Sequence, residues 1–185
     1  VLGTSVGAFH QVPLLLIDLE TGEGITGRSY LFGYFRAALP AVSSLVGEVE
    51  GVEKGHAVKP AELWAKLAQR FTLIGVQGIV RMAMSVFVAA CWDALAIAKG
   101  MPLVKMLGAE PRPIPAYNSC GLGLMDDRGA LADEAQKLLL GGFHAIKLRL
   151  GYPTLVEDIV AVQAVRKRIG DGVKLMVDYN QALSV

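Results

Sequence analysis

Residues 143–153, FHAIKLRLGYP, and residues 173–181, VKLMVDYNQ, are the two stretches that decide the fold of this chain. Each is a short apolar run typical of a buried strand, and each becomes polar at its end. Lys147 and Arg149 are two residues apart in the first stretch, and Asp178 and Asn180 are two apart in the second. Because side chains alternate across a strand, the members of each pair leave the same face.

The residues between these stretches predict a helix. Apolar side chains recur there every three or four positions, which is the spacing of one helix face: Leu155, Ile159, Val162, Val165 and Ile169. Strand, helix and strand make a β-α-β unit, and its right-handed connection makes the two strands parallel. The cation pair and the carboxylate are therefore expected at the carboxyl-terminal edge of the sheet, where α/β proteins carry their chemistry.

The composition favours a buried α/β sheet and excludes two classes of partner. A hydrophobic fraction of 53% and a mean hydropathy of +0.45 suit strands that are buried on both faces. The formal net charge is +1, so no basic excess favours nucleic acid or an anionic membrane as partner. Cys91 and Cys120 are isolated thiols, a pattern typical of cytosolic proteins, and no secretory leader opens the sequence. We expect a cytoplasmic protein.

Residues 71–98 form the most apolar segment. Arg81 and Asp93 divide it into uncharged runs of about ten residues, half of the roughly 20 that a membrane-spanning helix needs. The segment therefore predicts a buried helix from about residue 79 to 99 rather than a membrane anchor.

The first 111 residues predict a small α+β domain. Residues 1–11 have loop composition, and the β-rich runs 12–20 and 24–32 flank a glycine turn, which predicts a hairpin. Helices are expected over residues 36–50, from Pro60 onwards and over the apolar segment. Prolines at 111, 113 and 115 mark the expected boundary between domains 1–111 and 112–185.

The second domain repeats strand and helix. Strands are expected over 114–119, 145–150 and 174–178, with a helix over 127–140, and the repeat of about 30 residues is typical of β-α-β units. The third strand has no following helix, and a parallel sheet that ended there would expose an apolar edge. We therefore expect an incomplete α/β protein, with its C-terminal part absent from this sequence.

The polar strand ends have two interpretations each. Asp178 and Asn180 could supply oxygen ligands to Mg²⁺, or Asp178 could cap a following helix. Lys147 and Arg149 could bind a carboxylate or move a proton, with Arg149 mainly a fixed positive charge, or they could be a solvated edge pair. Ser119 could donate a hydrogen bond to substrate or simply stabilise a turn.

A dinucleotide site is the alternative from another class of enzyme. Gly121-x-Gly123 follows a predicted strand and precedes a helix, as in a dinucleotide-binding loop, although Asp126 takes the third glycine position. Cations at the end of the second strand would suit NADP, so a Rossmann-type oxidoreductase stays open, as does a non-catalytic scaffold fragment.

Taken together, these stretches resemble mandelate racemase and its relatives in the mandelate racemase/muconate lactonizing enzyme family of the enolase superfamily. The resemblance rests on VPLLLIDLETGEGITGRSYLFGY at 12–34, RMAMSVFVAACWDALA at 81–96, MPLVKMLGA at 101–109, the Lys147-x-Arg149-Leu-Gly-Tyr-Pro segment and Val177-Asp178-Tyr-Asn-Gln. It implies an α+β capping domain over residues 1–111, followed by the first three strands of a (β/α)₇β TIM-like barrel.

The resemblance also implies a reaction. Enzymes of this superfamily remove the proton α to a carboxylate through an enediolate that Mg²⁺ stabilises. Asp178 would be the first of three acidic metal ligands, with Asn180 beside it. Lys147 would contact the carboxylate of a 2-hydroxy acid, and the enzyme would be a racemase or an acid-sugar dehydratase.

Four further residues would bind the substrate in this reading. Ser119 would bind its carboxylate, while Tyr30 and a loop that contains Val6 and Phe9 would close over it. A small-molecule carboxylate is thus the expected partner, and relatives suggest a homo-oligomer.

Two positions depart from the family pattern. Arg149 replaces the second lysine of a Lys-x-Lys pair, and racemisation needs a proton acceptor on each face of the α-carbon. A poor base at this position favours a one-base dehydration. Phe87 and Val88 replace an Ile-Asp pair in the helical signature, and we attach no functional role to that change.

Overall fold

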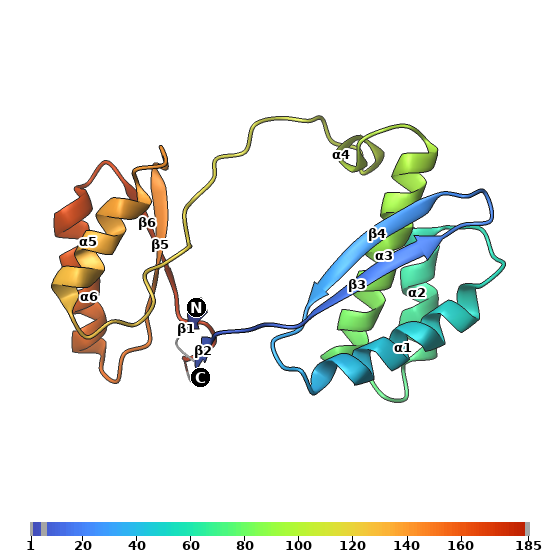
Figure 1. Ribbon diagram of the computed structural model, residues 1–185, viewed down its shortest axis with the longest axis horizontal. Coiled ribbons are helices and arrows are strands. Elements are labelled where there is room, and N and C mark those ends of the chain that lie inside the picture. Colours follow the sequence, from blue (N-terminus) through green and yellow to red (C-terminus); the bar gives the residue numbers. More distant parts are fainter. Residues whose placement is uncertain (1, 5–6, 184–185) are drawn as a thin grey trace. The chain divides into compact units, whose positions relative to one another are not determined.

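The computed structural model of the chain describes residues 2–4 and 7–183 (Figure 1). The chain divides into two compact units, one of residues Val12–Arg112 and the other of Pro113–Val185 together with Val1–Gln11. The division falls within the proline cluster, whereas the first eleven residues group with the second unit. We describe each unit by itself.

The first unit contains the predicted hairpin. Strands β3 (Leu14–Glu20) and β4 (Thr26–Phe32) pair antiparallel, from Leu14 opposite Phe32 to Glu20 opposite Thr26. Gly24 has a φ of 77°, which side chains disfavour and which the turn requires. The strand-turn-strand pattern alone was sufficient to predict this element.

Four helices complete this unit. They are α1 (Ala38–Glu53), α2 (Pro60–Arg70), α3 (Ile79–Ala98) and α4 (Leu103–Met106). The predicted helix over 36–50 begins two residues later and ends three residues later than expected, with Pro40 in its first turn, where no N–H is needed. Pro60 is the first residue of α2, as predicted.

Helix α3 is the centre of the core of this unit. It packs on β3, β4, α1 and α2, and Phe87 and Val88, the two departures from the family signature, are 4% and 7% exposed in that core. By length and composition α3 is the one helix of the described residues that could cross a membrane, and 56% of its apolar window is buried. Such burial is typical of a core helix.

A glycine sets the distance between β4 and α3. A Cβ atom at Gly27 would overlap the carbonyl oxygen of Ala90 and lie 2.6 Å from the backbone nitrogen of Ala94. One residue on, the N–H of Arg28 donates to Oδ2 of Asp93 at 2.7 Å. The edge of β4 is therefore held directly against the helix.

The second unit contains the predicted β-α-β element. Strands β5 (Ala145–Arg149) and β6 (Lys174–Asp178) are parallel neighbours, with α6 (Leu155–Ile169) between them in the sequence and α5 (Arg128–Leu138) before them. Ile146 and Leu148 are fully buried in a core with residues of both helices. The side chains on the other face of β5 are thereby left for the site.

Two sequence-based predictions for this unit were wrong. The strand expected over 114–119 is a single bridge between Asn118 and Ile146, because the prolines before it have no N–H to donate to a ladder. Residues expected to be loop include an antiparallel pair, β1 (Leu2–Thr4) and β2 (Gly7–Phe9). Such pairing uses backbone groups and needs no side-chain pattern.

Candidate functional site

An ion pair joins the ends of the two parallel strands. Nζ of Lys147 on β5 lies 2.8 Å from Oδ2 of Asp178 on β6, and their side chains are 20% and 30% exposed. The register aligns Arg149 with Asp178, so all three residues lie at the carboxyl-terminal edge, as predicted from the β-α-β pattern. A cation and a carboxylate thus share one partly buried position.

The environment of Asp178 stabilises its charged form. The hydrogen bond from Lys147, then that from the N–H of Asn180 to Oδ1 at 2.8 Å, lowers the pKa of this carboxyl below its ordinary value. Asp178 caps no helix, since residues 179–183 contain a turn at 180–181 and no helix. Nζ of Lys147 also lies 5.7 Å from the centroid of the Tyr117 ring.

Arg149 is buried and donates hydrogen bonds to the backbone of a neighbouring loop. Its side chain is 6% exposed, and its guanidinium donates to the carbonyl oxygens of Ser119 at 3.3 Å and of Gly121 at 2.5 Å. The interpretation of Lys147 and Arg149 as a solvated edge pair is therefore wrong. The fixed positive charge expected at Arg149 is directed at carbonyls of this chain, and it holds the segment that carries Ser119.

Three more side chains fix the loops at this edge, and sequence reasoning missed all of them. Glu134 accepts from the N–H of Leu122 at 2.8 Å, and the hydroxyl of Tyr152 donates to the carbonyl oxygen of Met125 at 3.0 Å. Asp158, only 6% exposed, accepts from the N–H groups of Gly151 and Tyr152. The position of Asp158 in the first turn of α6, where acidic residues are favoured, was the one sequence signal for any of these three contacts.

The oxygen donors present suit part of a Mg²⁺ site. Asp178 supplies a carboxylate, and Oδ1 of Asn180 is buried without a hydrogen-bond partner in the described part of the chain. Both are oxygen ligands of the kind that Mg²⁺ prefers. No group of three or more histidine, cysteine or acidic side chains suited to a metal occurs among the described residues, so Asp178 and Asn180 could hold the ion only as part of a larger set.

Two of the predicted substrate residues, Ser119 and Tyr30, lie in different units of the chain. Ser119 is half-buried beside β5, where its carbonyl meets Arg149. Tyr30 is 70% exposed on β4, which belongs to the first unit. Val6 lies outside the described residues, and for Phe9 only the backbone is described, at the end of β2.

The segment around Gly121 does not form a dinucleotide cradle. Helix α5 begins at Arg128, and the side chain of Asp127 accepts from the N–H groups of Gly129 and Ala130 at its first turn. The N–H of Leu122 is also taken, by Glu134. Phosphate binding at such a loop needs free N–H groups at a helix start, and here a carboxylate already occupies them.

Comparison with protein families identifies the fold. A model described as "Mandelate racemase / muconate lactonizing enzyme, N-terminal domain" matches residues 2–108, and one described as "Enolase C-terminal domain-like" matches residues 130–185. The chain belongs to the mandelate racemase/muconate lactonizing enzyme family. The resemblance inferred from its motifs is thereby confirmed.

Other members of the mandelate racemase/muconate lactonizing enzyme family are similar over almost all of this chain. A 3,6-anhydro-alpha-L-galactonate cycloisomerase of Streptomyces coelicolor is 30% identical over 97% of the chain and 50% of the relative. An arabinonate dehydratase of Saccharolobus solfataricus is 27% identical over 94% of the chain and 47% of the relative. The chain thus spans about half the length of these curated relatives.

Solved structures of enolase-superfamily proteins contain magnesium. An enolase from the alpha proteobacterium BAL199 with bound magnesium superposes with a TM-score of 0.89 at 36% identity, over 98% of this chain and 51% of that one. An enolase from Bradyrhizobium, complexed with magnesium and mandelic acid, gives 0.86 at 38% identity, over 98% and 50%. The α/β architecture of this family member is therefore that of the superfamily, over about half of its length.

Proposed function

We propose that this chain forms the capping domain and the first three barrel strands of a (β/α)₇β enzyme that depends on Mg²⁺ and ionises a 2-hydroxy acid. The reaction would remove the proton α to the substrate carboxylate and give an enediolate. One observation carries the proposal: Lys147 and Asp178 lie 2.8 Å apart at the carboxyl-terminal edge of two parallel strands. Membership of the family and the magnesium in its solved relatives support it.

The residues of this chain would divide the work. Lys147 has three donors and uses one on Asp178, so the others can bind a substrate carboxylate. The hydroxyl of Ser119 would donate a hydrogen bond to the substrate carboxylate, from a segment that Arg149 holds in position. Asp178 and Asn180 would contribute oxygen ligands to Mg²⁺. When bound, the ion supplies positive charge that stabilises the negative charge developing on the substrate carboxylate.

We favour dehydration over racemisation. A guanidinium that is buried against two carbonyl groups is held as a donor, and it is a poor proton acceptor near neutral pH. With no base at Arg149, a residue outside this sequence would take the α-proton, and an acid on that same face would protonate the hydroxyl at the neighbouring carbon, which would leave as water; the resulting enol would become a 2-keto acid. Relatives include L-talarate/galactarate and arabinonate dehydratases, although others are epimerases and racemases.

The test uses the complete enzyme with Mg²⁺ in deuterated water. A panel of 2-hydroxy acids and acid sugars is screened by NMR for deuterium at the α-carbon and for 2-keto product. The proposal predicts exchange or keto product with at least one acid, and keto product identifies a dehydratase. Absence of both exchange and keto product across the panel, or a reaction that Asp178→Asn leaves unchanged, would contradict it.

Intact mass separates an enzyme from a scaffold fragment. The chain has a mass of 19.7 kDa, and it spans about half of its relatives. We expect the natural protein to have about twice that mass. A natural product of 19.7 kDa would favour a non-catalytic role. A cytoplasmic location and a homo-oligomeric state stay predictions, which cell fractionation and light scattering would test.

A further inference from the structure

Asp158 is a buried carboxylate that the proposed reaction does not use. It lies in the first turn of α6 and is 6% exposed. Arg149 is the one other charged residue in the described part of the chain that is buried. Burial of a charged carboxylate is costly unless other groups stabilise the charge. The donors around Asp158 therefore indicate which segments it holds.

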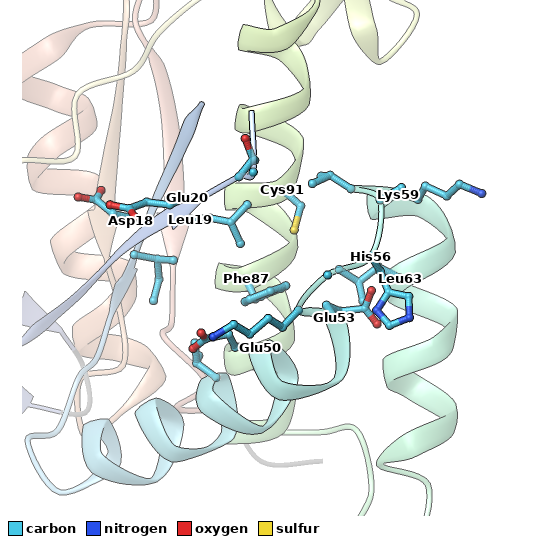
Figure 2. A pocket seen from close by; sticks show the side chains of 18 of the residues that line it. Asp18, Leu19, Glu20, Glu50, Glu53, His56, Lys59, Leu63, Phe87 and Cys91 are labelled. Carbon is cyan, nitrogen blue, oxygen red and sulfur yellow. The ribbon is translucent and has the colours of Figure 1, made fainter. Parts of the chain in front are cut away.

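A largely buried carboxylate often pairs with a cation, as Glu53 does in the first unit. Glu53 lines a cavity of that unit (Figure 2), and one of its carboxylate oxygens lies 2.5 Å from Nζ of Lys66. Asp158, by contrast, forms no ion pair with a lysine or arginine among residues 2–4 and 7–183. Its oxygens accept from neutral donors instead, namely backbone N–H groups and a tyrosine.

The backbone donors come from the turn that follows β5. Oδ1 of Asp158 accepts from the N–H of Gly151 at 2.9 Å and from that of Tyr152 at 3.0 Å. The residue before them, Leu150, donates its N–H to the carbonyl oxygen of Asp178 at 3.0 Å. Three successive N–H groups thus connect Asp158 with the end of β6.

The tyrosine donor is Tyr179, which lies between the two candidate metal ligands in the sequence. Burial raises the pKa of Tyr179, as do the negative charge of Asp158 and a hydrogen bond to that carboxylate. Tyr179 also packs against the buried core cluster of this unit. Its side chain is therefore anchored at α6, whereas that of Asp178 meets Lys147 at the site.

The turn that carries Asn180 has a disfavoured backbone conformation. Asn180 and Gln181 have φ angles of 47° and 65°, in the left-handed region that residues other than glycine seldom adopt. Such a conformation persists where surrounding contacts fix it. Here the N–H of Asn180 donates to Oδ1 of Asp178 at 2.8 Å, and Tyr179 is bound to Asp158. These contacts hold both candidate ligands in one arrangement.

We propose that Asp158 is a positioning residue for the metal site and that it acts through the hydroxyl of Tyr179. The inference rests on the proposed function, in which Asp178 and Asn180 hold Mg²⁺. The contacts form a closed ring, because Asp158 binds the turn after β5, this turn binds the backbone of Asp178, and Tyr179 binds Asp158. The role is indirect, since the ring fixes the direction of the oxygens that bind the ion.

The test measures the Mg²⁺ affinity of the complete enzyme by calorimetric titration. Tyr179→Phe removes one hydroxyl and keeps both candidate ligands, whereas Asp158→Asn removes the charge that this hydroxyl meets and keeps an oxygen for the backbone N–H groups. Each should raise the dissociation constant for Mg²⁺ about tenfold, as the loss of a group that orients metal ligands does. Because both changes break one hydrogen bond, the double variant should also lose about tenfold and not about a hundredfold.

Tyr152→Phe is the matched control. It also removes one tyrosine hydroxyl, but that hydroxyl bonds to the backbone of Met125, and the N–H that Asp158 binds remains. The dissociation constant for Mg²⁺ should stay within about twofold of that of the unsubstituted enzyme.

Two further measurements separate positioning from a general loss of structure. Hydrogen exchange at the amide of Asn180 should become faster in metal-free Tyr179→Phe. With the acid that the screen identifies, its apparent KM for Mg²⁺ should rise about tenfold while kcat at saturating Mg²⁺ stays within about twofold, because every ligand is still present. A general structural defect would instead lower kcat at every Mg²⁺ concentration.

The outcomes distinguish this inference from the proposed function. Unchanged Mg²⁺ affinity in Tyr179→Phe, beside a loss in Asp178→Asn, would overturn the inference and leave the proposed function intact. Losses that multiply in the double variant, or an equal loss in Tyr152→Phe, would overturn it as well. Mg²⁺ affinity that Asp178→Asn leaves unchanged would overturn the proposed function and the inference together. If Asp158→Asn does not fold, Tyr179→Phe alone decides.

Discussion

Nζ of Lys147 lies 2.8 Å from Oδ2 of Asp178, although the two residues are 31 positions apart in the sequence. A helix and two turns separate them, and the parallel pairing of β5 and β6 brings them together. The pair combines a donor for a substrate carboxylate with a ligand for a cation. The pair should therefore affect both Mg²⁺ binding and the pH dependence of stability.

Asp178→Asn should weaken Mg²⁺ binding by the complete enzyme about tenfold or more and should abolish α-proton exchange, because the amide removes a charged ligand. Calorimetric titration with Mg²⁺ and NMR in deuterated water measure the two effects. Asp171→Asn, an exposed carboxylate in the loop before β6, is the matched control and should change neither. Equal losses in both variants would contradict the assignment.

The ion pair should make the stability of the chain depend on pH in acid. The pKa of Asp178 is lowered from 3.8 in the folded state, so the pair stabilises the fold above that value and is lost as the pH falls through the folded pKa. Asp178→Asn should cost about 1 kcal/mol or less at pH 7, and this difference should shrink below pH 3.8. Urea unfolding of both proteins at pH 7 and at a pH below 3.8 measures this difference in unfolding free energy. A difference that grows in acid would be the wrong sign.

Arg149→Lys should release the segment around Ser119. Lysine keeps the charge but cannot reach two carbonyl groups with a planar fork, so we expect a loss of about 1–3 kcal/mol of unfolding free energy. Hydrogen exchange of residues 119–123 should become faster. Arg168→Lys, which alters an exposed ion pair with Asp133, is the control and should change stability by less than about 0.5 kcal/mol. Unchanged exchange at 119–123 would argue against the role of Arg149 as a clamp.

Gly27→Ala should destabilise the first unit by about 3 kcal/mol, because its Cβ would overlap the backbone of α3 at Ala90 and Ala94. Gly47→Ala on α1 is the matched control, since no atom lies within 4 Å of the added carbon. It should stabilise the helix by about 0.5–1 kcal/mol. Thermal unfolding of both variants gives the two signs, and a neutral Gly27→Ala would show that β4 can move away from α3.

The two thiols should react at very different rates. Cys91 is 3% exposed, and burial together with the charge of Glu53 raises its pKa to about 11, whereas Cys120 is exposed. A thiol reagent at pH 8 should modify one cysteine rapidly in the folded chain and the second only after unfolding. Peptide mapping identifies the modified residue. Rapid labelling of Cys91 under native conditions would mean that the core around α3 opens readily.

Local patterns in the sequence were sufficient for most of the secondary structure. The bounds Lys174–Asp178 of β6 and the start of α2 at Pro60 agree with prediction, because alternation, helical spacing and proline act over a few residues. The same patterns placed Lys147, Arg149 and Asp178 at one sheet edge, since the handedness of a β-α-β connection is nearly invariant. Order and spacing of the motifs then determined the family.

Tertiary structure alone decided what these residues contact. Three contacts depend on partners 28 or more positions away. Arg149 donates to the carbonyls of Ser119 and Gly121, and Gly27 lies against α3. Residues 114–119 form one bridge rather than a strand. Periodicity reports which face of an element is buried, but it does not report the partner. Those contacts are set by close packing and by the need to satisfy buried polar groups, which only the folded chain defines.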